Sequence, residues 1–318
     1  MMTLKQMYDL AVAAGIKADP RGEKGIKKLL AHKKEAFEAM PAKAKKYFDK
    51  EDLANPFADS RVLVGDPNLK VSKAMAGIDI TSGEVAVAGL LNQQGAGIDL
   101  LIAHHPVGAP YAALHEVMDM QADNMARYGV PINIAEGVMR DRIEQVSRSV
   151  SPRNHNQAVD AARLLGLGLM CTHTITDNLV FDFLEKIFDK KKPETVQEVL
   201  DILHGIPEYQ EARKGKNGPV LFAGNPKNRA GRVAPLEITG GTEGSHIVYE
   251  KLAHAGVGTI ISMHASEEHR TEALKHHINL VIAGHMSSDS LGMNLLLDKF
   301  EKKGVKIVPC SGLIRIRR

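Results

Sequence analysis

The sequence contains no tryptophan, and it is poor in aromatic residues of every kind. Aromatic residues make up 4% of its 318 residues, so a stacking platform for single-stranded nucleic acid is not expected. No run approaches the roughly 20 apolar residues that a membrane span requires, and the first residues lack the apolar core of a secretory signal. We therefore expect a cytoplasmic protein with no membrane partner.

Cysteine is also scarce. The two cysteines, Cys171 and Cys310, lie far apart in the chain, each near an apolar, strand-like run. Two separated thiols provide neither a disulfide framework nor the paired spacing of a zinc ribbon. We expect both to be reduced thiols of the core, so that any metal site in this chain uses imidazole and carboxylate ligands.

The remaining composition is typical of a globular protein, with 44% hydrophobic and 25% charged residues. At 318 residues the chain exceeds the usual size of one domain, and we expect two. The net charge of +3 is uneven, because residues 1–50 hold 12 basic and 6 acidic side chains. This basic segment is typical of a solvated helical face, and the alternative is a contact with nucleic acid or another acidic surface.

Hydrophobic periodicity divides the chain into four parts. Residues 1–60 predict a helical appendage, with apolar stripes over 3–15 and 23–39. Residues 61–188 predict a first α/β half, and its segments 73–80, 84–94 and 100–103 form a strand-helix-strand unit with parallel strands. In the same half we expect further strands at 62–64, 130–135 and 167–172, and helices at 113–128, 136–149, 156–165 and 178–188.

The second part of the chain repeats this alternation after a charged connecting segment, residues 189–230. Residues 231–318 predict a second α/β half. Its apolar runs predict strands at 233–238, 257–263, 279–283, 305–308 and 313–316, separated by helices at 246–255, 266–276 and 290–302. The sequence is thus typical of an α/β protein with two units.

Three of the predicted strands end in histidine. His104 and His105 follow the strand 100–103, and His173 and His285 follow two later strands. Ligands collect outside the carboxyl ends of strands in open α/β sheets, so these side chains are candidates for one site. Each histidine taken alone is equally typical of a hydrogen-bonded core residue.

Two of these histidines carry a carboxylate four residues later, Asp177 after His173 and Asp289 after His285. Imidazole and carboxylate together suit Zn, Fe, Mn or Co. Five or six such ligands exceed the needs of one four-coordinate ion, and they fit a centre with two divalent metal ions per chain. Asp289 or Asp177 is the candidate for a carboxylate that bridges both ions.

A glycine-rich turn, residues 239–245, is the other candidate site. Backbone amides at Gly240, Gly241, Gly244 and Ser245 could cradle a phosphate group. The alternative is a tight turn between a strand and a helix. The chain lacks both G-x-G-x-x-G and a Walker lysine, so the motifs for dinucleotide binding and for a P-loop are absent.

Taken together, His104-His105-Pro106, His173-x-x-x-Asp177, Gly240-Gly241 and Gly284-His285-x-x-x-Asp289 resemble the Nif-three-like dinuclear metal-centre family. The resemblance covers about residues 61–188 and 231–318. It implies two similar three-layer α/β/α domains with mixed sheets, a metal site in the cleft between them, and a homohexamer. The implied metal ligands are His104, His105, Asp177, His285 and Asp289, with His173 as a further ligand or a supporting residue. This chain has Asp289 where the family usually has glutamate.

Members of this family often carry the label GTP cyclohydrolase I type 2 homologue. Our first hypothesis is a metal-dependent hydrolase that acts on a nucleotide or phosphoester through a metal-activated water, with His173 as the catalytic proton carrier. The second hypothesis is a non-enzymatic, metal-binding oligomeric scaffold or regulator that binds a protein or nucleic-acid partner. A small-molecule substrate and a homo-oligomer are the expected partners under the first hypothesis.

Overall fold

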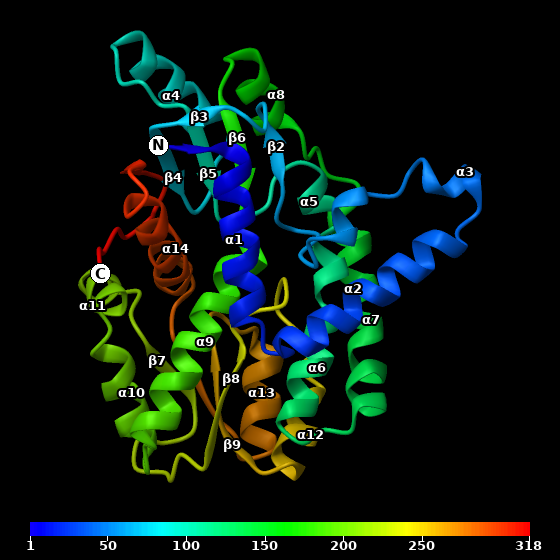
Figure 1. Ribbon diagram of the computed structural model, residues 1–318. Helices are drawn as coiled ribbons and strands as arrows, with labels where there is room; N and C mark the ends of the chain where they lie inside the picture. The colour runs from blue at the N-terminus through cyan, green and yellow to red at the C-terminus, as the bar shows by residue number, and fades with distance from the viewer.

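The computed structural model describes all 318 residues and contains two main β-sheets (Figure 1). One sheet has the strand order β11-β4-β5-β6-β2, the other has the order β7-β10-β9-β8, and β1 pairs with β3. The strands are β1 (Met2–Thr3), β2 (Val62–Val64), β3 (Lys70–Val71), β4 (Lys73–Gly77), β5 (Leu100–Ala103), β6 (Gly168–Cys171), β7 (Val220–Ala223), β8 (Arg232–Glu237), β9 (Val257–Ser262), β10 (Asn279–Ile282) and β11 (Lys306–Pro309).

Both main sheets are mixed. In the first sheet, β11, β4, β5 and β6 are parallel and the edge strand β2 is antiparallel. In the second sheet, β8, β9 and β10 are parallel and the edge strand β7 is antiparallel. Parallel neighbours require crossover connections, which helices supply here. The predicted α/β fold class with mixed sheets is confirmed.

Helices surround the sheets and account for most of the remaining chain. They are α1 (Leu4–Ala18), α2 (Gly22–Ala39), α3 (Ala42–Lys45), α4 (Ser82–Gln93), α5 (Ala109–Ala112), α6 (Asp119–Arg127), α7 (Ile132–Val150), α8 (Gln157–Leu164), α9 (His173–Lys191), α10 (Val196–His204), α11 (Pro207–Lys214), α12 (Val248–His254), α13 (Glu267–Lys275) and α14 (His285–Glu301). Short 3-10 helices lie at Lys50–Leu53 and Leu114–Val117. None of the helices combines the length and the apolar character that crossing a bilayer requires.

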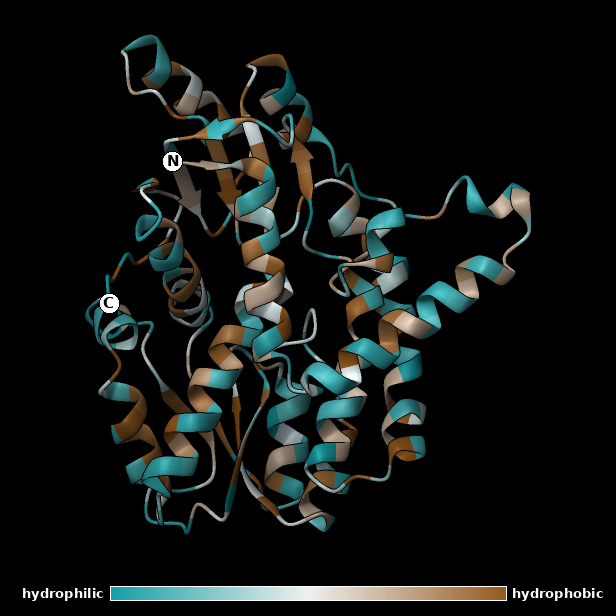
Figure 2. Ribbon diagram, viewed as in Figure 1, coloured by the Kyte–Doolittle hydropathy of each residue, from teal (hydrophilic) through white to brown (hydrophobic).

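Both faces of each main sheet are covered, because successive strand residues point to opposite sides. In β5, Leu100 and Ile102 enter a core shared with α1 and α14, whereas Leu101 and Ala103 enter a core shared with α4 and α8. The second sheet packs against α6, α7, α12 and α13 on one face and against α9, α10 and α11 on the other. Figure 2 accordingly shows the strands largely in brown and much of the outlying α2 in teal.

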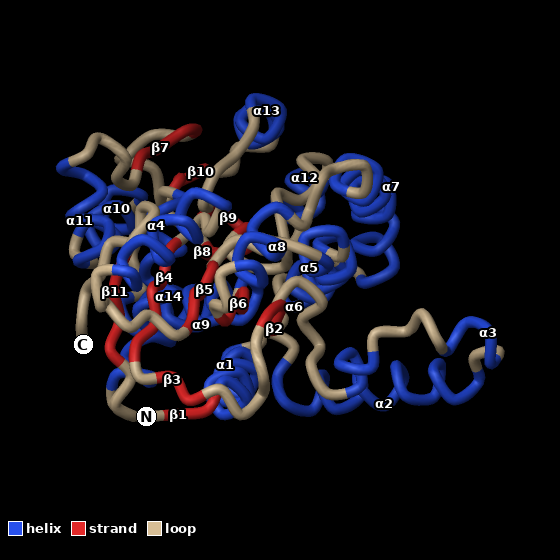
Figure 3. The backbone as a smooth tube through the Cα atoms, turned by 90° about the horizontal axis from the view of Figure 1, so that it is seen from above, coloured by secondary structure: helices blue, strands red, loops and turns tan.

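Several contacts join parts of the chain that are far apart in the sequence. β11, near the end of the chain, pairs with β4 in the first sheet, and β7 pairs with β10 in the second. Helix α1 packs against α9, and α9 packs against α14. The view from above in Figure 3 shows α2 and α3 extending away from this body. These contacts run across the predicted boundaries at 60, 188 and 230. The boundaries themselves remain predictions.

Two predicted strands are wrong. Residues 130–135 enter α7, because Pro131 stands before its first turn and lacks the N–H that a strand ladder needs. The buried positions of α7, which include Ala135 and Met139, follow a helical period. Residues 313–316 form no strand, because Ile314 bonds instead to side chains of α14. Its N–H donates to Ser290 Oγ, and its carbonyl accepts from Asn294 Nδ2.

Gly292 is the point of closest packing between α14 and α9. A Cβ atom at this position would lie 2.4 Å from the carbonyl oxygen of Thr176 and 2.8 Å from Cγ2 of Val180. Both contacts are far inside van der Waals distance, so only glycine permits this approach. The approach matters for the site described below, because α9 and α14 both carry its residues.

We predict that Gly292→Ala destabilises the protein by roughly 1–3 kcal/mol, because overpacking forces two buried helices apart. Denaturant unfolding of the purified variant measures this change. Gly137→Ala is the matched control, since Gly137 is an exposed residue of α7 with no atom within 4 Å of an added Cβ. The control should gain about 0.5–1 kcal/mol from helix propensity. Equal stability of Gly292→Ala and wild type would contradict the packing described here.

Candidate metal centre

The predicted histidines all lie at the carboxyl ends of strands. His104 and His105 follow β5, His173 follows β6 after Thr172, and His285 follows β10 after Gly284. The helices α9 and α14 begin at His173 and His285 themselves, earlier than the predicted starts at residues 178 and 290. Gly284 has a φ of 102°, a conformation that glycine adopts without strain, and it lets the chain turn from strand to helix at once.

The early helix starts bring each carboxylate beside its histidine. Residues four apart lie on one face of a helix, so Asp177 and Asp289 point in the same direction as His173 and His285. His285 Nε2 lies 3.5 Å from Asp289 Oδ2, and His173 Nε2 lies 3.8 Å from Asp177 Oδ2. Asp177 is therefore a residue of the second turn of α9 and not the cap of a later helix.

All six predicted side chains converge. His104 Nε2 lies 3.5 Å from Asp177 Oδ1 and 3.4 Å from Asp289 Oδ1. His105 Nε2 lies 3.5 Å from Asp289 Oδ2 and 3.3 Å from His285 Nε2. Three overlapping triads of potential ligand atoms, each within 4.8 Å, result: His104, His105 and His173; His105, His285 and Asp289; His104, Asp177 and Asp289.

The opposite ring nitrogens of three histidines are held by hydrogen bonds. His104 Nδ1 donates to Thr176 Oγ1 at 2.9 Å, His105 Nδ1 to Asp79 Oδ1 at 2.8 Å and His173 Nδ1 to Asp59 Oδ2 at 2.8 Å. Each bond leaves the Nε2 atom directed into the cluster. A histidine that binds metal characteristically donates its other N–H to a carboxylate or another fixed acceptor, and this arrangement matches that pattern.

Several atoms at the centre of the cluster are buried without a protein partner. His104 Nε2, Asp177 Oδ1 and both carboxylate oxygens of Asp289 have no hydrogen bond. Asp177 and Asp289 are 3% and 0% exposed. An uncompensated buried carboxylate is costly, whereas a metal ion between such atoms satisfies them all. The donor set therefore fits a divalent cation.

The spacing of the donor atoms also fits. Ligand atoms around a tetrahedral ion with bonds of ~2.0–2.1 Å are roughly 3.3–3.4 Å apart. The three edges between His105 Nε2, His285 Nε2 and Asp289 Oδ2 are 3.3, 3.5 and 3.5 Å. On the other side, Asp289 Oδ1 faces His104 and joins Asp177 in a second triad. The two oxygens of Asp289 thus face two different sets of ligands.

Burial and the neighbouring charges shift the pKa values within the cluster. Burial lowers the pKa of His104 and of His285 to about 4, so both imidazoles are neutral donors at neutral pH. Burial also raises the pKa of Asp177 well above its usual value. Burial opposes ionisation of Asp289 as well, but His104, His105 and His285 together hold its pKa below the usual range. Against the effect of burial, the neighbouring carboxylates of Asp289 and Asp79 raise the pKa of His105 to about 10.

Three residues of the site were not predicted. Asp79 lies just after β4, so the strand-end argument that found the histidines also applies to it. Asp59 is buried and also accepts from Thr174 Oγ1, but its segment carries no recognisable pattern. His264 follows β9, and its ring centroid lies 4.8 Å from that of His285. Because His264 comes shortly after β9, the strand-end argument applies to it as well.

The glycine-rich turn lies beside the centre but does not form one cradle. Gln121 Nε2 donates to the carbonyl oxygens of Gly240 and Thr242, and its side chain fills the inside of the turn. Gly241 lines the space next to the histidines, whereas Gly244 and Ser245 line a separate hollow of about 910 Å³. Phosphate binding by this turn remains a prediction.

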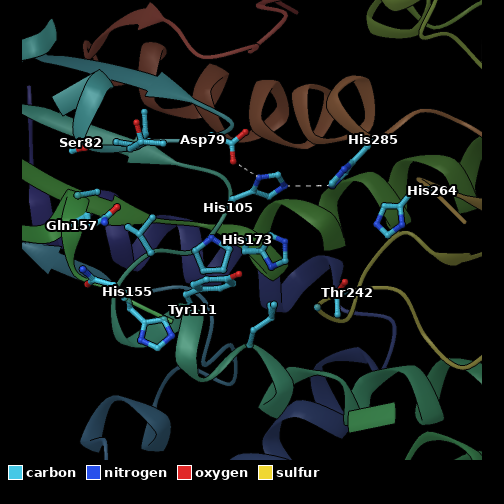
Figure 4. Close-up of a pocket in the computed structure, with 18 residues that line it drawn as sticks. Asp79, Ser82, His105, Tyr111, His155, Gln157, His173, Thr242, His264 and His285 are labelled. Carbon is cyan, nitrogen blue, oxygen red and sulfur yellow. Dashed lines mark hydrogen bonds and ion pairs between the residues drawn. The ribbon is translucent and has the colours of Figure 1, made fainter. Parts of the chain in front are cut away.

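A cavity of about 450 Å³ opens onto the cluster (Figure 4). His105, His173 and His285 form one wall of it, and Figure 4 shows His264 beside His285. A smaller hollow of about 30 Å³ lies behind the cluster, against Glu237 and Glu243. Burial raises the pKa of Glu237 to about 7. The site thus has an open side that admits a small molecule and a closed side that does not.

Comparison with known proteins supports the resemblance seen in the motifs. No family model and no curated protein matches the chain. Among solved structures, the chain is similar to a NIF3 superfamily protein from Sphaerobacter thermophilus, with 26% identity and a TM-score of 0.70 over 80% of this chain and 92% of that one. It also shares its fold with reduced HcgD from Methanocaldococcus jannaschii, with 17% identity and a TM-score of 0.50 over 87% and 96% of the two chains. By its motifs, its fold and this likeness, the chain resembles the proteins of the NIF3, or Nif-three-like, superfamily.

Proposed function

We propose that this protein binds two divalent metal ions per chain. With these ions bound, it acts as a hydrolase of a nucleotide or phosphoester. The observation that carries the proposal is the set of buried, unpartnered ligand atoms at His104, Asp177 and Asp289. Side chains that only packed the core would have found partners within the protein, as buried polar groups generally do. A soluble cation is the partner that their chemistry requires.

The donor atoms divide into two sets that share Asp289. His105, His285 and Asp289 Oδ2 would hold one ion, and His104, Asp177 and Asp289 Oδ1 would hold the other. Imidazole and carboxylate without thiolate suit Zn, Fe, Mn or Co. When bound, such ions lower the pKa of a coordinated water and polarise the bond that is attacked.

His173 is the residue that we assign to proton transfer. Its ring lines the cavity, and Asp59 fixes its orientation by accepting from Nδ1. With Nδ1 so engaged, Nε2 is the nitrogen that can hold a proton from water and pass it to a leaving group in the cavity. The neutral imidazoles of His104 and His285 serve as donors to metal and not as acids.

We predict that the protein, purified without chelators and without a histidine tag, contains about two metal ions per chain. The double variant His104→Ala, His285→Ala should lose both, because one ligand is removed from each set of donors. Elemental mass spectrometry measures the metal content directly. The matched control is His254→Ala, His276→Ala, which removes two histidines of α12 and of the loop after α13, outside the cluster.

The same proteins test the hydrolase. Metal-loaded wild type and the control should hydrolyse a phosphoester or nucleotide within a panel that includes bis-p-nitrophenyl phosphate and nucleoside phosphates, and the site variant should not. If the wild type holds metal but hydrolyses none of these compounds, the hydrolase part of the proposal is wrong and the metal centre stands. Absence of stoichiometric metal after Zn, Fe, Mn and Co have each been supplied would overturn the whole proposal.

Asp59 provides an independent prediction. Its carboxylate is fully buried and contacts His173 and Thr174. We predict that Asp59→Asn lowers the hydrolytic activity of the metal-loaded protein by about 10- to 100-fold, because Nδ1 of His173 loses the carboxylate that fixes the ring for proton transfer. Initial rates at equal metal content measure this change. Asp9→Asn, an exposed change in the same N-terminal region, should leave the rate unaltered, and equal rates in both variants would refute the role of Asp59.

A further inference from the structure

Away from its histidines, the cavity beside the metal centre contains no cationic side chain. None of its 18 lining residues is lysine or arginine. Apart from the histidines, Asp79 is the only lining residue with a charged side chain. Asp79 already accepts from His105 Nδ1, and the Asp79 pKa is lowered by that bond. Sites for several phosphate groups normally contain lysine or arginine side chains. Away from the histidines, this cavity offers no such partner.

The wall away from the histidines is neutral and polar. Asn154 and Gln157 lie on it at the turn between α7 and α8, and Thr81 and Ser82 lie at the start of α4. Figure 4 shows Gln157, His155, Tyr111 and Ser82 across the cavity from His264 and His285. Amides and hydroxyls both donate and accept hydrogen bonds, so this wall suits uncharged groups that do the same.

The nearby Arg153 does not change this charge distribution. Its guanidinium donates to the hydroxyl of Tyr111 at 2.7 Å and to the carbonyl of Ser149 at 3.2 Å, and it does not line the cavity. Apolar groups complete the lining, among them Val107, Leu114 and Ala158. A volume of about 450 Å³ is within the range of sites that hold small organic ligands. The cavity therefore combines one end made of metal ligands with a neutral body.

We propose that the cavity takes a ligand with a single anionic group at the histidine end and an uncharged, ring-bearing, hydrogen-bonding body on the Asn154–Gln157 side, as in a nucleoside monophosphate. This inference rests on the metal-binding function proposed above and narrows its substrate class. The further phosphates of a nucleoside triphosphate would extend away from the histidine end, where the lining has no lysine or arginine. The structure thus favours ligands with one phosphate group over polyphosphates.

Isothermal titration of the metal-loaded full chain tests this. The probes are inorganic phosphate, AMP with ATP, and GMP with GTP. We expect at least one monophosphate to bind tenfold or more tighter than inorganic phosphate, because the neutral wall contacts the body. We expect its triphosphate to bind no tighter than the monophosphate. A triphosphate that binds tighter than its monophosphate, or monophosphates that bind no tighter than inorganic phosphate, would overturn the inference.

Variants of the neutral wall locate the effect. Asn154→Ala with Gln157→Ala should weaken monophosphate binding by about tenfold, the effect of losing two hydrogen-bonding side chains, and should leave inorganic phosphate binding unchanged. Both residues are exposed, so the variant is expected to fold. The matched control is Asn156→Ala, which lies between them in sequence but outside the lining. Equal monophosphate binding by this control and the double variant would contradict the assignment of the wall.

Metal content, measured on the same samples, separates the two proposals. Metal-loaded protein that fails the ligand tests would overturn the substrate class and leave the metal centre standing. Protein that holds no metal would overturn the function proposed above, and with it the inference that depends on it.

Discussion

The burial of two carboxylates at one point is the constraint on which the rest of this structure depends. Asp177 and Asp289 lie inside the protein, and Asp177 Oδ1 and both oxygens of Asp289 lack a hydrogen-bond partner. Such groups oppose folding unless a cation compensates them. Around them the protein places the neutral imidazoles of His104 and His285, ring nitrogens fixed by hydrogen bonds, and two helices that begin at the site. We interpret this arrangement as a preformed metal centre.

The fold serves this centre by joining distant parts of the chain. Two parallel strands of the first sheet and one of the second deliver the histidines, while α9 and α14 carry the carboxylates. Gly292 lets these helices approach closely. The N-terminal 60 residues also take part, because Asp59 holds His173, and Asn178 donates to the carbonyl of Gly15. Removal of that segment would therefore disturb the site itself.

The sequence predicted the fold class and the convergence of six side chains, because strand ends and the four-residue helical spacing are local patterns. It did not predict Asp59, whose partner His173 is 114 residues away, since a contact of that range leaves no periodic signal. The strand predicted at 130–135 was wrong because a short apolar run fits strand and helix alike, and Pro131 favours the helix. The sequence also did not predict that Gln121 fills the turn at Gly240, because the two residues are 119 positions apart. Ligand type is thus easier to predict than the supporting contacts.

Anomalous X-ray diffraction from crystals of protein purified without chelators tests the central claim most directly. Data collected on both sides of the absorption edge identify the element and place each ion. The account predicts two anomalous peaks per chain on opposite sides of the Asp289 carboxylate, one near His105 and His285 and the other near His104 and Asp177. A structure with ordered side chains, supplied with Zn, Fe, Mn or Co and showing no peak at Asp289, would contradict it.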